Sequence, residues 1–220
     1  GVAFICLSDG AENAITVAPG ANAALVADDL PDLAGVDILL LQLETPIEAV
    51  TAWAARARAA GVRVVLNAAP ARVLPDALLR QIDVLIVNEG ELAMLAHDAD
   101  DLITALKSVQ VPAVVVTLGA AGCIAREGTD LHLQPAFPVT AVDTTAAGDT
   151  FCGVLVAALA RGETLVAGLR AAAAASALAC TALGAQSSVP ARADVDALLR
   201  GDADSAGLDA LAARCASSAA

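Results

Sequence analysis

The residue with the clearest chemical potential in this sequence is Asp149, which follows three small residues, Ala146, Ala147 and Gly148. Small side chains let a ligand approach the backbone, and the apolar pattern that follows predicts that a helix starts here. The unpaired N–H groups of a first helical turn attract anions such as phosphate. A carboxylate repels an anion at rest, so its presence indicates a general base that takes a proton from a nucleophile attacking phosphorus.

Asp149 also has a purely structural interpretation, because Asp is a favoured N-cap residue at a helix start. The segment taken alone does not decide between an N-cap and a base. The decision therefore depends on whether other residues of matching chemistry occur elsewhere in the chain.

Three further segments place polar or glycine residues where a predicted strand ends, which is where ligands bind in open α/β sheets. Asn88 and Glu91 follow one strand, and their spacing also predicts a capping box. Thr117 to Gly122 follow the next strand, and two glycines there allow a turn that brings backbone against a ligand or simply opens a hairpin. Glu44 ends an earlier strand, where it is either a ligand of hydroxyl groups or a solvated loop acid.

The composition excludes several classes of partner. A formal net charge of −13 argues against nucleic acid and against an anionic membrane. Five cysteines without a Cys-x-x-Cys pair indicate a reduced, cytoplasmic protein. Residues 171–191 carry no charge, but they are mostly Ala with polar residues, Gly184 and Pro190, which favours a buried helix followed by a loop over a membrane span.

Apolar runs alternate with helical patterns through the middle of the chain, which predicts a parallel sheet covered by helices. The expected strands are 36–43, 62–66, 84–87 and 111–118, followed by a hairpin over 122–133 at the end of the sheet. The expected helices are 47–60, 74–80, 91–95, 101–109, 146–160, 164–183 and 192–199. Residues 201–220 are small and polar and are expected to form a loosely packed, Ala-rich tail.

The motifs together resemble those of the ribokinase-like carbohydrate kinases. The segment 143–151, Asp-Thr-Thr-Ala-Ala-Gly-Asp-Thr-Phe, is similar to the second signature of that family. In the family's order, 88–91 resembles its Asn-x-x-Glu motif, 117–122 its Thr-Leu-Gly-x-x-Gly nucleotide loop, and 184–190 closes the set. Segments 20–25 and 41–46 resemble ribokinases more than the wider family. The resemblance runs from Gly1 to about Leu199. It favours the interpretation of Asp149 as a general base over that as an N-cap.

The resemblance implies a three-layer α/β/α fold with a mostly parallel central sheet, and ATP-dependent phosphorylation of D-ribose to ribose 5-phosphate. Asp149 would be the general base, with an anion hole formed by Ala146, Ala147 and Gly148. ATP is the implied co-substrate, with Mg²⁺ and the monovalent cation K⁺ as cofactors.

The resemblance also assigns the remaining site residues. The residues implied to bind nucleotide are Asn88, Thr117, Leu118, Gly119, Ala120, Ala121, Gly122, Gly148 and Ala173. Glu91 would order water around Mg²⁺, while Glu44 and Asp149 would bind the sugar. The positions implied to enclose the monovalent cation, mostly through backbone carbonyls, are Asp143, Thr145, Ala179, Ala182, Gly184 and Ser188.

The sequence departs from the family in two ways. Ala173 stands where ribokinases carry Asn or His beside the adenine. The family's N-terminal strands, its lid, a Gly-Gly-Lys-Gly sugar loop and an early sugar-binding Asp are not found in the chain, which opens on Gly1 and not on Met. We therefore expect residues 1–200 to be the C-terminal two thirds of a kinase domain.

Two alternatives stay open at this point. One is a non-catalytic remnant that binds nucleotide, and the other is a related sugar or nucleoside kinase with a different substrate. A homodimer is possible for a full-length protein, because ribokinases often pair through lid strands.

Overall fold

The computed structural model describes residues 1–7, 13–96, 99, 101–201 and 206–217. Its centre is a six-stranded sheet in the order β3-β4-β5-β6-β7-β8. The strands are β3 (Ile38–Leu41), β4 (Arg63–Asn67), β5 (Val84–Asn88), β6 (Ala113–Thr117), β7 (Gly122–Glu127) and β8 (Asp130–Pro135). The first four are parallel to one another, and β7 and β8 form an antiparallel hairpin at the edge, as predicted.

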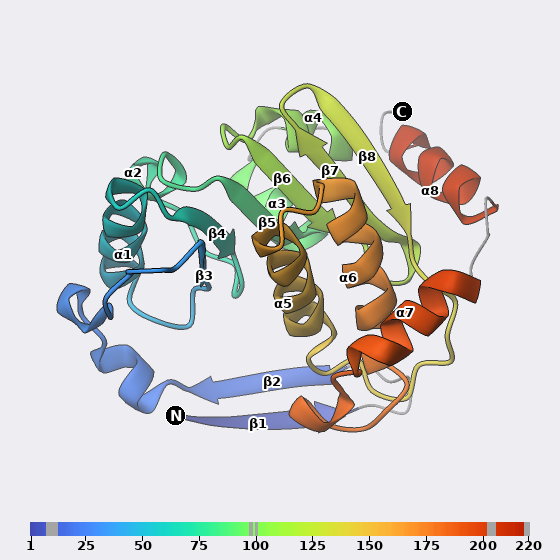
Figure 1. The fold of residues 1–220 in the computed structure, drawn as a ribbon, viewed down its shortest axis with the longest axis horizontal. Coiled ribbons are helices and arrows are strands. Elements are labelled where there is room, and N and C mark those ends of the chain that lie inside the picture. The colour runs from blue at the N-terminus through green and yellow to red at the C-terminus, as the bar shows by residue number, and fades with distance from the viewer. Residues whose placement is uncertain (8–12, 97–98, 100, 202–205, 218–220) are drawn as a thin grey trace.

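Helices cover both faces of this sheet and give three layers (Figure 1). One face carries α5 (Ala147–Ala160), α6 (Leu165–Ala179) and α7 (Arg192–Gly201). The other carries α1 (Ile47–Ala59), α2 (Asp76–Leu79), α3 (Glu89–Leu95), α4 (Leu102–Ser108) and α8 (Ala206–Ser217). The expected fold class, a mostly parallel sheet between helices, is confirmed.

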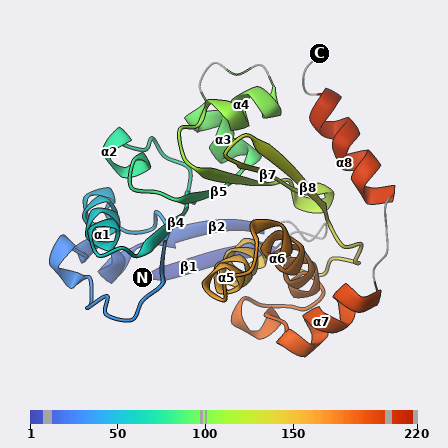
Figure 2. The same ribbon diagram turned by 45° about the horizontal axis from the view of Figure 1, so that its top comes forward.

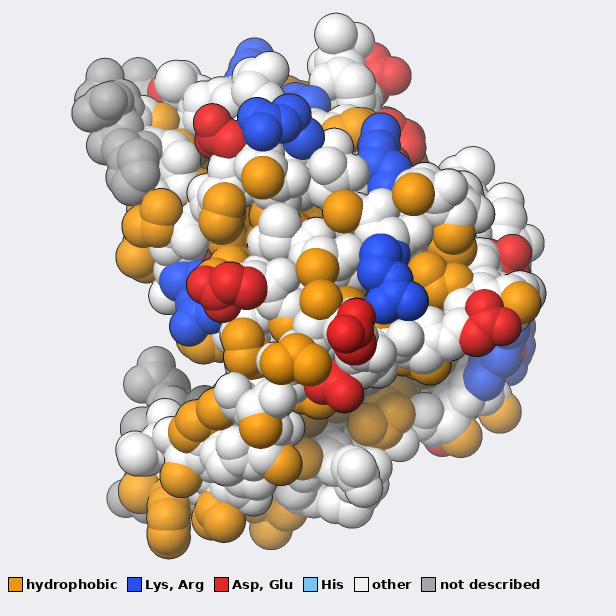
Figure 3. All heavy atoms as spheres, turned by 90° about the vertical axis from the view of Figure 1, so that its left-hand side faces the viewer, with side chains coloured by type: hydrophobic (Ala, Val, Ile, Leu, Met, Phe, Trp, Pro, Cys, Tyr) orange, Lys and Arg blue, Asp and Glu red, His pale blue; other side chains and the backbone are white. Residues whose placement is uncertain are grey.

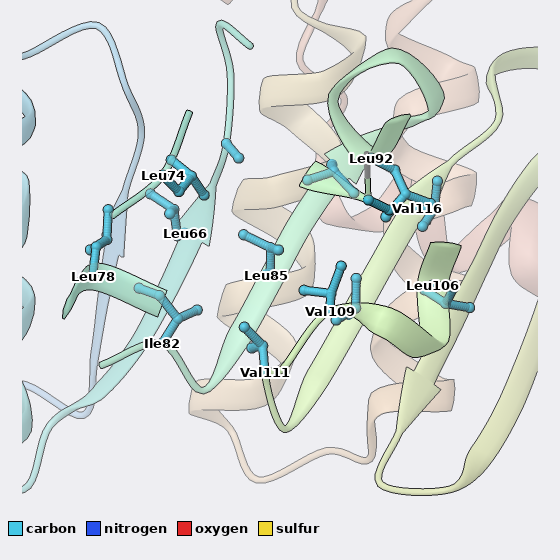
Figure 4. Close-up of a cluster of buried hydrophobic side chains, with 14 of the residues drawn as sticks. Leu66, Leu74, Leu78, Ile82, Leu85, Leu92, Leu106, Val109, Val111 and Val116 are labelled. Carbon is cyan, nitrogen blue, oxygen red and sulfur yellow. The ribbon is translucent and has the colours of Figure 1, made fainter. Parts of the chain in front are cut away.

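Successive side chains of a strand face the two helical layers in turn. Val114 and Val116 of β6 contribute to the core under α1 to α4, whereas Val115 between them contributes to the core under α5 and α6. This division follows from the two-residue period of a strand, which turns successive side chains to opposite faces. Figure 4 shows the first of these cores, with Leu66, Leu85 and Val116 pointing from neighbouring strands into one cluster.

Two strands that we did not predict lie outside the central sheet. β1 (Val2–Leu7) and β2 (Asn13–Ala18) form a separate antiparallel pair, which runs below the central sheet in Figure 1. The apolar side chains of the pair that the structure describes are exposed, Phe4 most of all at 67%. Hydrophobic side chains also gather in the lower part of the face shown in Figure 3.

Short 3₁₀ helices complete the described chain. η1 (Gly20–Ala24) and η2 (Ala27–Asp29) connect β2 toward β3, η3 (Gly119–Ala121) joins β6 to β7, and η4 (Gln186–Ser188) follows α6. Among the described residues, no helix combines the length and apolarity that a bilayer crossing requires. The uncharged stretch of residues 171–191 is divided between α6 and the loop after it, as expected.

The prediction of a loose C-terminal tail was wrong for residues 206–217. They form α8, whose Leu211 and Cys215 are buried in the same core as the strands. The rest of the predicted tail after Gly201, residues 202–205 and 218–220, lies outside the described part of the chain. Apolar residues at positions 211 and 215 have the i, i+4 spacing of one helix face, which was the signal for this element.

Candidate active site

A pocket of about 360 Å³ opens at the carboxyl edge of the parallel strands. Three parts of the chain that were predicted to bind nucleotide meet in it: the two-glycine turn with η3, the start of α5, and α6. The predicted residues that line it are Thr117, Gly119, Ala120, Gly122, Ala147, Gly148 and Ala173. The volume is in the range that encloses a small organic ligand.

The pocket's opposite wall was not predicted. It is the apolar segment between β8 and α5, with Ala136, Phe137, Pro138, Val139 and Ala141. Phe137 is buried there, and the guanidinium of Arg170 lies 5.5 Å from the centre of its ring. An apolar run directly after a hairpin was the signal in the sequence, but nothing local indicated that it folds back over η3.

Gly122 fixes the path of the turn. Its φ is +109°, and a Cβ at this position would lie 2.1 Å from the Gln134 carbonyl oxygen of β8. No other residue fits at such a distance, so glycine is required for β7 to begin pairing with β8 directly after η3. Gly119, with φ +57°, supplies the first left-handed residue of the same turn.

The register of the sheet brings Asn88 to this turn. Asn88 of β5 pairs with Thr117 of β6, and the Thr117 hydroxyl donates to the Val87 carbonyl at 3.4 Å. The Asn88 side chain accepts from the Glu91 amide at 2.8 Å, and the Glu91 carboxylate accepts from the Asn88 amide at 2.8 Å. The predicted capping box is therefore confirmed, and it fixes both side chains at the sheet edge.

Glu91 is only 7% exposed. Burial raises the pKa of its carboxyl group, and the hydrogen bond from the Asn88 amide opposes this in part. The nearby thiol of Cys152 in α5 has its pKa raised to about 12, first by burial and then by the negative charges of Asp149 and Glu91. The carboxylates of Glu91 in α3 and Asp149 in α5 therefore both lie near the Cys152 thiol.

The structure excludes the N-cap interpretation of Asp149. Helix α5 begins at Ala147 with Ala146 as its N-cap, so Asp149 is the third helical residue. Asp149 is exposed, and its side chain makes no hydrogen bond within the part of the chain that the structure describes. The carboxylate is thus available to a ligand beside Gly148, where an added Cβ would meet no atom within 4 Å.

The turn before α5 is held in an unusual backbone conformation. Ala146 has φ +60° and ψ +9°, the left-handed region that L-residues other than glycine avoid. The hydroxyl of Ser176 in α6 donates to the Ala147 carbonyl at 3.0 Å and so ties the turn to the neighbouring helix. Ser176 also lines the pocket and was not predicted.

The predicted cation site is assembled around Asp143, which is 5% exposed. One carboxylate oxygen accepts from the Thr145 amide at 2.8 Å and the other from the Gly184 amide at 3.0 Å. Hydrogen bonds from the Thr145 hydroxyl, the Gly184 amide and the Thr145 amide lower the pKa of Asp143. The carbonyl of Cys180 accepts from the Val142 and Asp143 amides, which brings the end of α6 to the same place.

The other predicted cation positions lie on this junction. Ala179 ends α6, Ala182 and Gly184 follow in the loop, and buried Ser188 ends η4, where its hydroxyl donates to the Ala185 carbonyl. The junction offers hard oxygen donors around one buried carboxylate, a set that suits an alkali cation. For Mg²⁺, the predicted residue is Glu91, whose carboxylate is the kind of oxygen group that this ion uses directly or through water. The described residues contain no cluster of three His, Cys, Asp or Glu side chains for a transition metal.

Several predicted residues do not line the pocket. Asn88, Glu91, Ala146 and Asp149 lie beside it, and Leu118 and Ala121 belong to the turn without facing the cavity. Glu44 is exposed at the end of β3, where its amide donates to the Gln42 side chain. Its place at the carboxyl edge matches the prediction, but the structure does not bring it to the pocket wall.

A larger hollow, of about 690 Å³, lies at the opposite edge of the sheet. Its walls include Arg63, Glu127 and the ion pair between Arg58 and Asp83, and none of the predicted site residues belongs to it. The described cysteines are all free.

The family model described as pfkB family carbohydrate kinase matches residues 1–192. The ribokinase of Haemophilus influenzae is 40% identical over 203 residues, which cover 87% of this chain and 66% of that protein.

Solved structures give the same picture. The Thermotoga maritima ribokinase has a TM-score of 0.81 at 36% identity, covering 90% of this chain and 69% of that one. An Arabidopsis thaliana ribokinase in complex with ribose and ATP has a TM-score of 0.80 at 31% identity, covering 90% and 68%. The chain thus spans about two thirds of the length of the proteins that it matches.

Proposed function

The chain belongs to the pfkB family of carbohydrate kinases, and we propose that it carries the nucleotide-binding and catalytic part of an ATP-dependent kinase for D-ribose. The observation that carries this proposal is the arrangement at the start of α5. Gly148 and Ala147 line the 360 Å³ pocket together with the two-glycine turn, and the exposed Asp149 carboxylate directly follows Gly148.

The adenosine of ATP would occupy the pocket between η3 and the apolar wall of residues 136–141. The adenosine can approach the backbone of the turn closely, because Gly119 and Gly122 leave no side chain between them. The phosphates would then extend toward Asn88 and the first turn of α5. There the N–H group of Gly148 would donate to the charge that develops on the transferred phosphoryl group, whereas the Ala147 N–H already donates to the Thr144 carbonyl at 3.2 Å.

Asp149 would act as general base. It would take the proton of the sugar's primary 5-hydroxyl group, and the hydroxyl oxygen would form a bond to the γ-phosphorus. The bond between that phosphorus and the β–γ bridging oxygen would break, and its electron pair would leave with ADP. The Asp149 carboxylate is exposed, so the sugar hydroxyl can reach it.

Two cations complete the proposal. Mg²⁺ would neutralise the phosphate charge, with Glu91 holding one of its waters. Asp143, Thr145 and the carbonyls near Gly184 would hold a monovalent cation, with K⁺ as the proposed ion, at the base of the α5 turn. Asp143 joins the turn before α5 to the loop after α6 through two hydrogen bonds, so an ion there would stiffen the anion hole.

The choice of sugar rests on the relatives. A ribokinase is among the similar sequences, and the Arabidopsis relative was solved with ribose and ATP. Glu44 would orient the sugar by accepting hydrogen bonds from two hydroxyl groups. Glu44 follows β3, and β3 contacts α5, the helix that carries Asp149.

The test measures binding and turnover separately. Titration calorimetry with MgATP measures the nucleotide site. Release of ADP in the presence of ribose, 2-deoxyribose, fructose or a nucleoside measures phosphoryl transfer. The assay is run with the 220-residue chain and with a longer protein translated from the same reading frame further upstream. We expect MgATP to bind and ribose to give the highest kcat/KM in KCl.

Each outcome separates the alternatives. Binding of MgATP without ADP release for any alcohol would support the non-catalytic remnant. A higher kcat/KM for another alcohol would support a related kinase. Failure to bind MgATP would contradict the proposal as a whole.

A further inference from the structure

Helix α8 is packed closely against the elements of the nucleotide edge. It contacts β8, α4 and η3, and Figure 2 shows it beside β8. Leu211 and Cys215, 2% and 5% exposed, join the core against which Ala121 of η3 packs. A Cβ on Gly207 would lie 2.9 Å from Pro135 of β8, so the two elements touch at this glycine.

The same helix is joined to α3 by an ion pair. A single terminal nitrogen of Arg214 lies 2.9 and 2.8 Å from the two carboxylate oxygens of Glu89, 125 positions earlier in the chain. Glu89 is the first residue of α3 and stands between Asn88 and Glu91 in sequence. Helix α8 therefore contacts both η3 and the start of α3.

The charge at this edge makes the ion pair consequential. The chain carries a net charge of −13, and Glu89 directly follows Asn88, the residue toward which the phosphates of ATP would extend. An unpaired Glu89 would add repulsion to a ligand that is itself an anion. Arg214 neutralises that charge and does not line the pocket, because α8 packs on the face of the sheet that carries α1 to α4.

We propose that α8 supports nucleotide binding through its charge, in that Arg214 neutralises Glu89 at the start of α3, close to the two-glycine turn. The inference rests on the proposed function, since it assumes that ATP binds at this edge. Helix α8 lies beyond residues 1–192, the part of the chain that the family model matches.

The test is a double-mutant cycle on MgATP affinity, measured by calorimetry in low salt. Arg214→Ala is expected to raise the Kd about threefold to fivefold, the size expected for a half-exposed ion pair. Glu89→Gln alone should leave the Kd equal or lower, and Glu89→Gln with Arg214→Ala should return it to that of the unsubstituted chain. The effect of Arg214→Ala should shrink as NaCl is added, because salt screens exposed charges.

The control is Arg192→Ala, which removes the same charge from α7, where Arg192 pairs with Asp196. It should leave the Kd unchanged. An Arg214→Ala protein that binds MgATP as tightly as the unsubstituted chain would overturn the inference, as would a double variant that stays as weak as Arg214→Ala. If the unsubstituted chain binds no MgATP, the inference and the proposed function fall together, whereas the first two outcomes leave the proposed function standing.

Discussion

The Gly184 amide donates a hydrogen bond of 3.0 Å to the carboxylate of Asp143, 41 positions earlier in the chain. The bond joins the loop after α6 to the turn before α5, and the second carboxylate oxygen of Asp143 accepts from Thr145 within that turn. One buried side chain therefore sets where the first turn of α5 lies relative to α6. The expected consequences concern this turn and the carboxylates around it.

Replacing Asp149 with Asn should lower kcat by about 10²- to 10⁴-fold, because the variant keeps the shape of the side chain and loses the base. Affinity for MgATP should change little, since Asp149 does not line the nucleotide pocket. ADP release under saturating ribose and calorimetry with MgATP measure the two quantities. A variant with near-normal kcat would remove Asp149 from the mechanism.

Gly148→Ala should raise the stability of the protein and lower its kinase activity. The added Cβ meets no protein atom within 4 Å, and Ala favours a helix, so the free energy of unfolding should rise by up to about 1 kcal/mol. The same Cβ would occupy space proposed for the phosphoryl group, and a displacement of about 1 Å there costs roughly a hundredfold in kcat. Urea denaturation and the kinase assay together test this. Gly153→Ala, later in α5 and also facing open space, is the matched control.

Glu91→Gln should remove a buried charge and keep the capping box, because Gln can still accept from the Asn88 amide. Burial raises the pKa of Glu91 in the folded state, so its stabilising contribution is present in full below the unfolded pKa and is lost as pH rises through the folded pKa. At neutral pH the variant should therefore be at least as stable as the unsubstituted chain. Activity should fall about 10- to 100-fold if Glu91 orders water around Mg²⁺.

The decisive comparison for Glu91 is the Mg²⁺ dependence of the rate. The variant should need a higher Mg²⁺ concentration for half-maximal activity. A loss of stability at neutral pH, or an unchanged Mg²⁺ dependence, would count against the role assigned to this carboxylate.

Acid should weaken the fold through Asp143. Its folded pKa is lowered by hydrogen bonds from Thr145 and Gly184, so its contribution is present above the unfolded pKa and is lost as pH falls through the folded pKa. The unsubstituted chain should lose stability from about pH 4 downward, given an ordinary Asp pKa of about 3.9. Asp143→Asn should be less stable at pH 7 and show a smaller loss on acidification, as followed by thermal unfolding.

Asp101 offers a matched control for Asp143. Its pKa is also lowered, mainly by hydrogen bonds from Thr104, but it caps α4 away from the site. Asp101→Asn should change how the stability of the fold depends on pH at acidic pH, without altering the activation of the kinase by K⁺. Asp143→Asn should change both, and K⁺ activation that survives in it would place the cation elsewhere.

Ala146 should tolerate only glycine well. An L-residue in the left-handed region costs about 1 to 2 kcal/mol, so Ala146→Gly should be neutral or stabilising by up to about 1 kcal/mol. Ala146→Val should destabilise the protein, because a branched side chain is disfavoured further at positive φ. Urea midpoints of the two variants should move in opposite directions, and a stable Val variant would show that the turn adopts another conformation in solution.

The sequence alone determined the features that depend on near neighbours. The strands β3 to β6 follow from short apolar runs, and the capping box of Asn88 and Glu91 follows from a spacing of three. These signals are local because hydrogen bonds within a turn and the periodicity of a strand involve residues close in the chain. They were sufficient to order the motifs and to place them at one edge of a parallel sheet.

Tertiary structure decided the features that join distant residues. The wall of residues 136–141, the ion pair of Arg214 with Glu89 and the burial of Leu211 all depend on packing across the sheet. Apolar residues such as Phe4 promote strand formation whether they end buried or exposed, so the sequence did not show that β1 and β2 stand apart. Close packing selects one arrangement among many with similar local patterns, and only the assembled fold supplies that information.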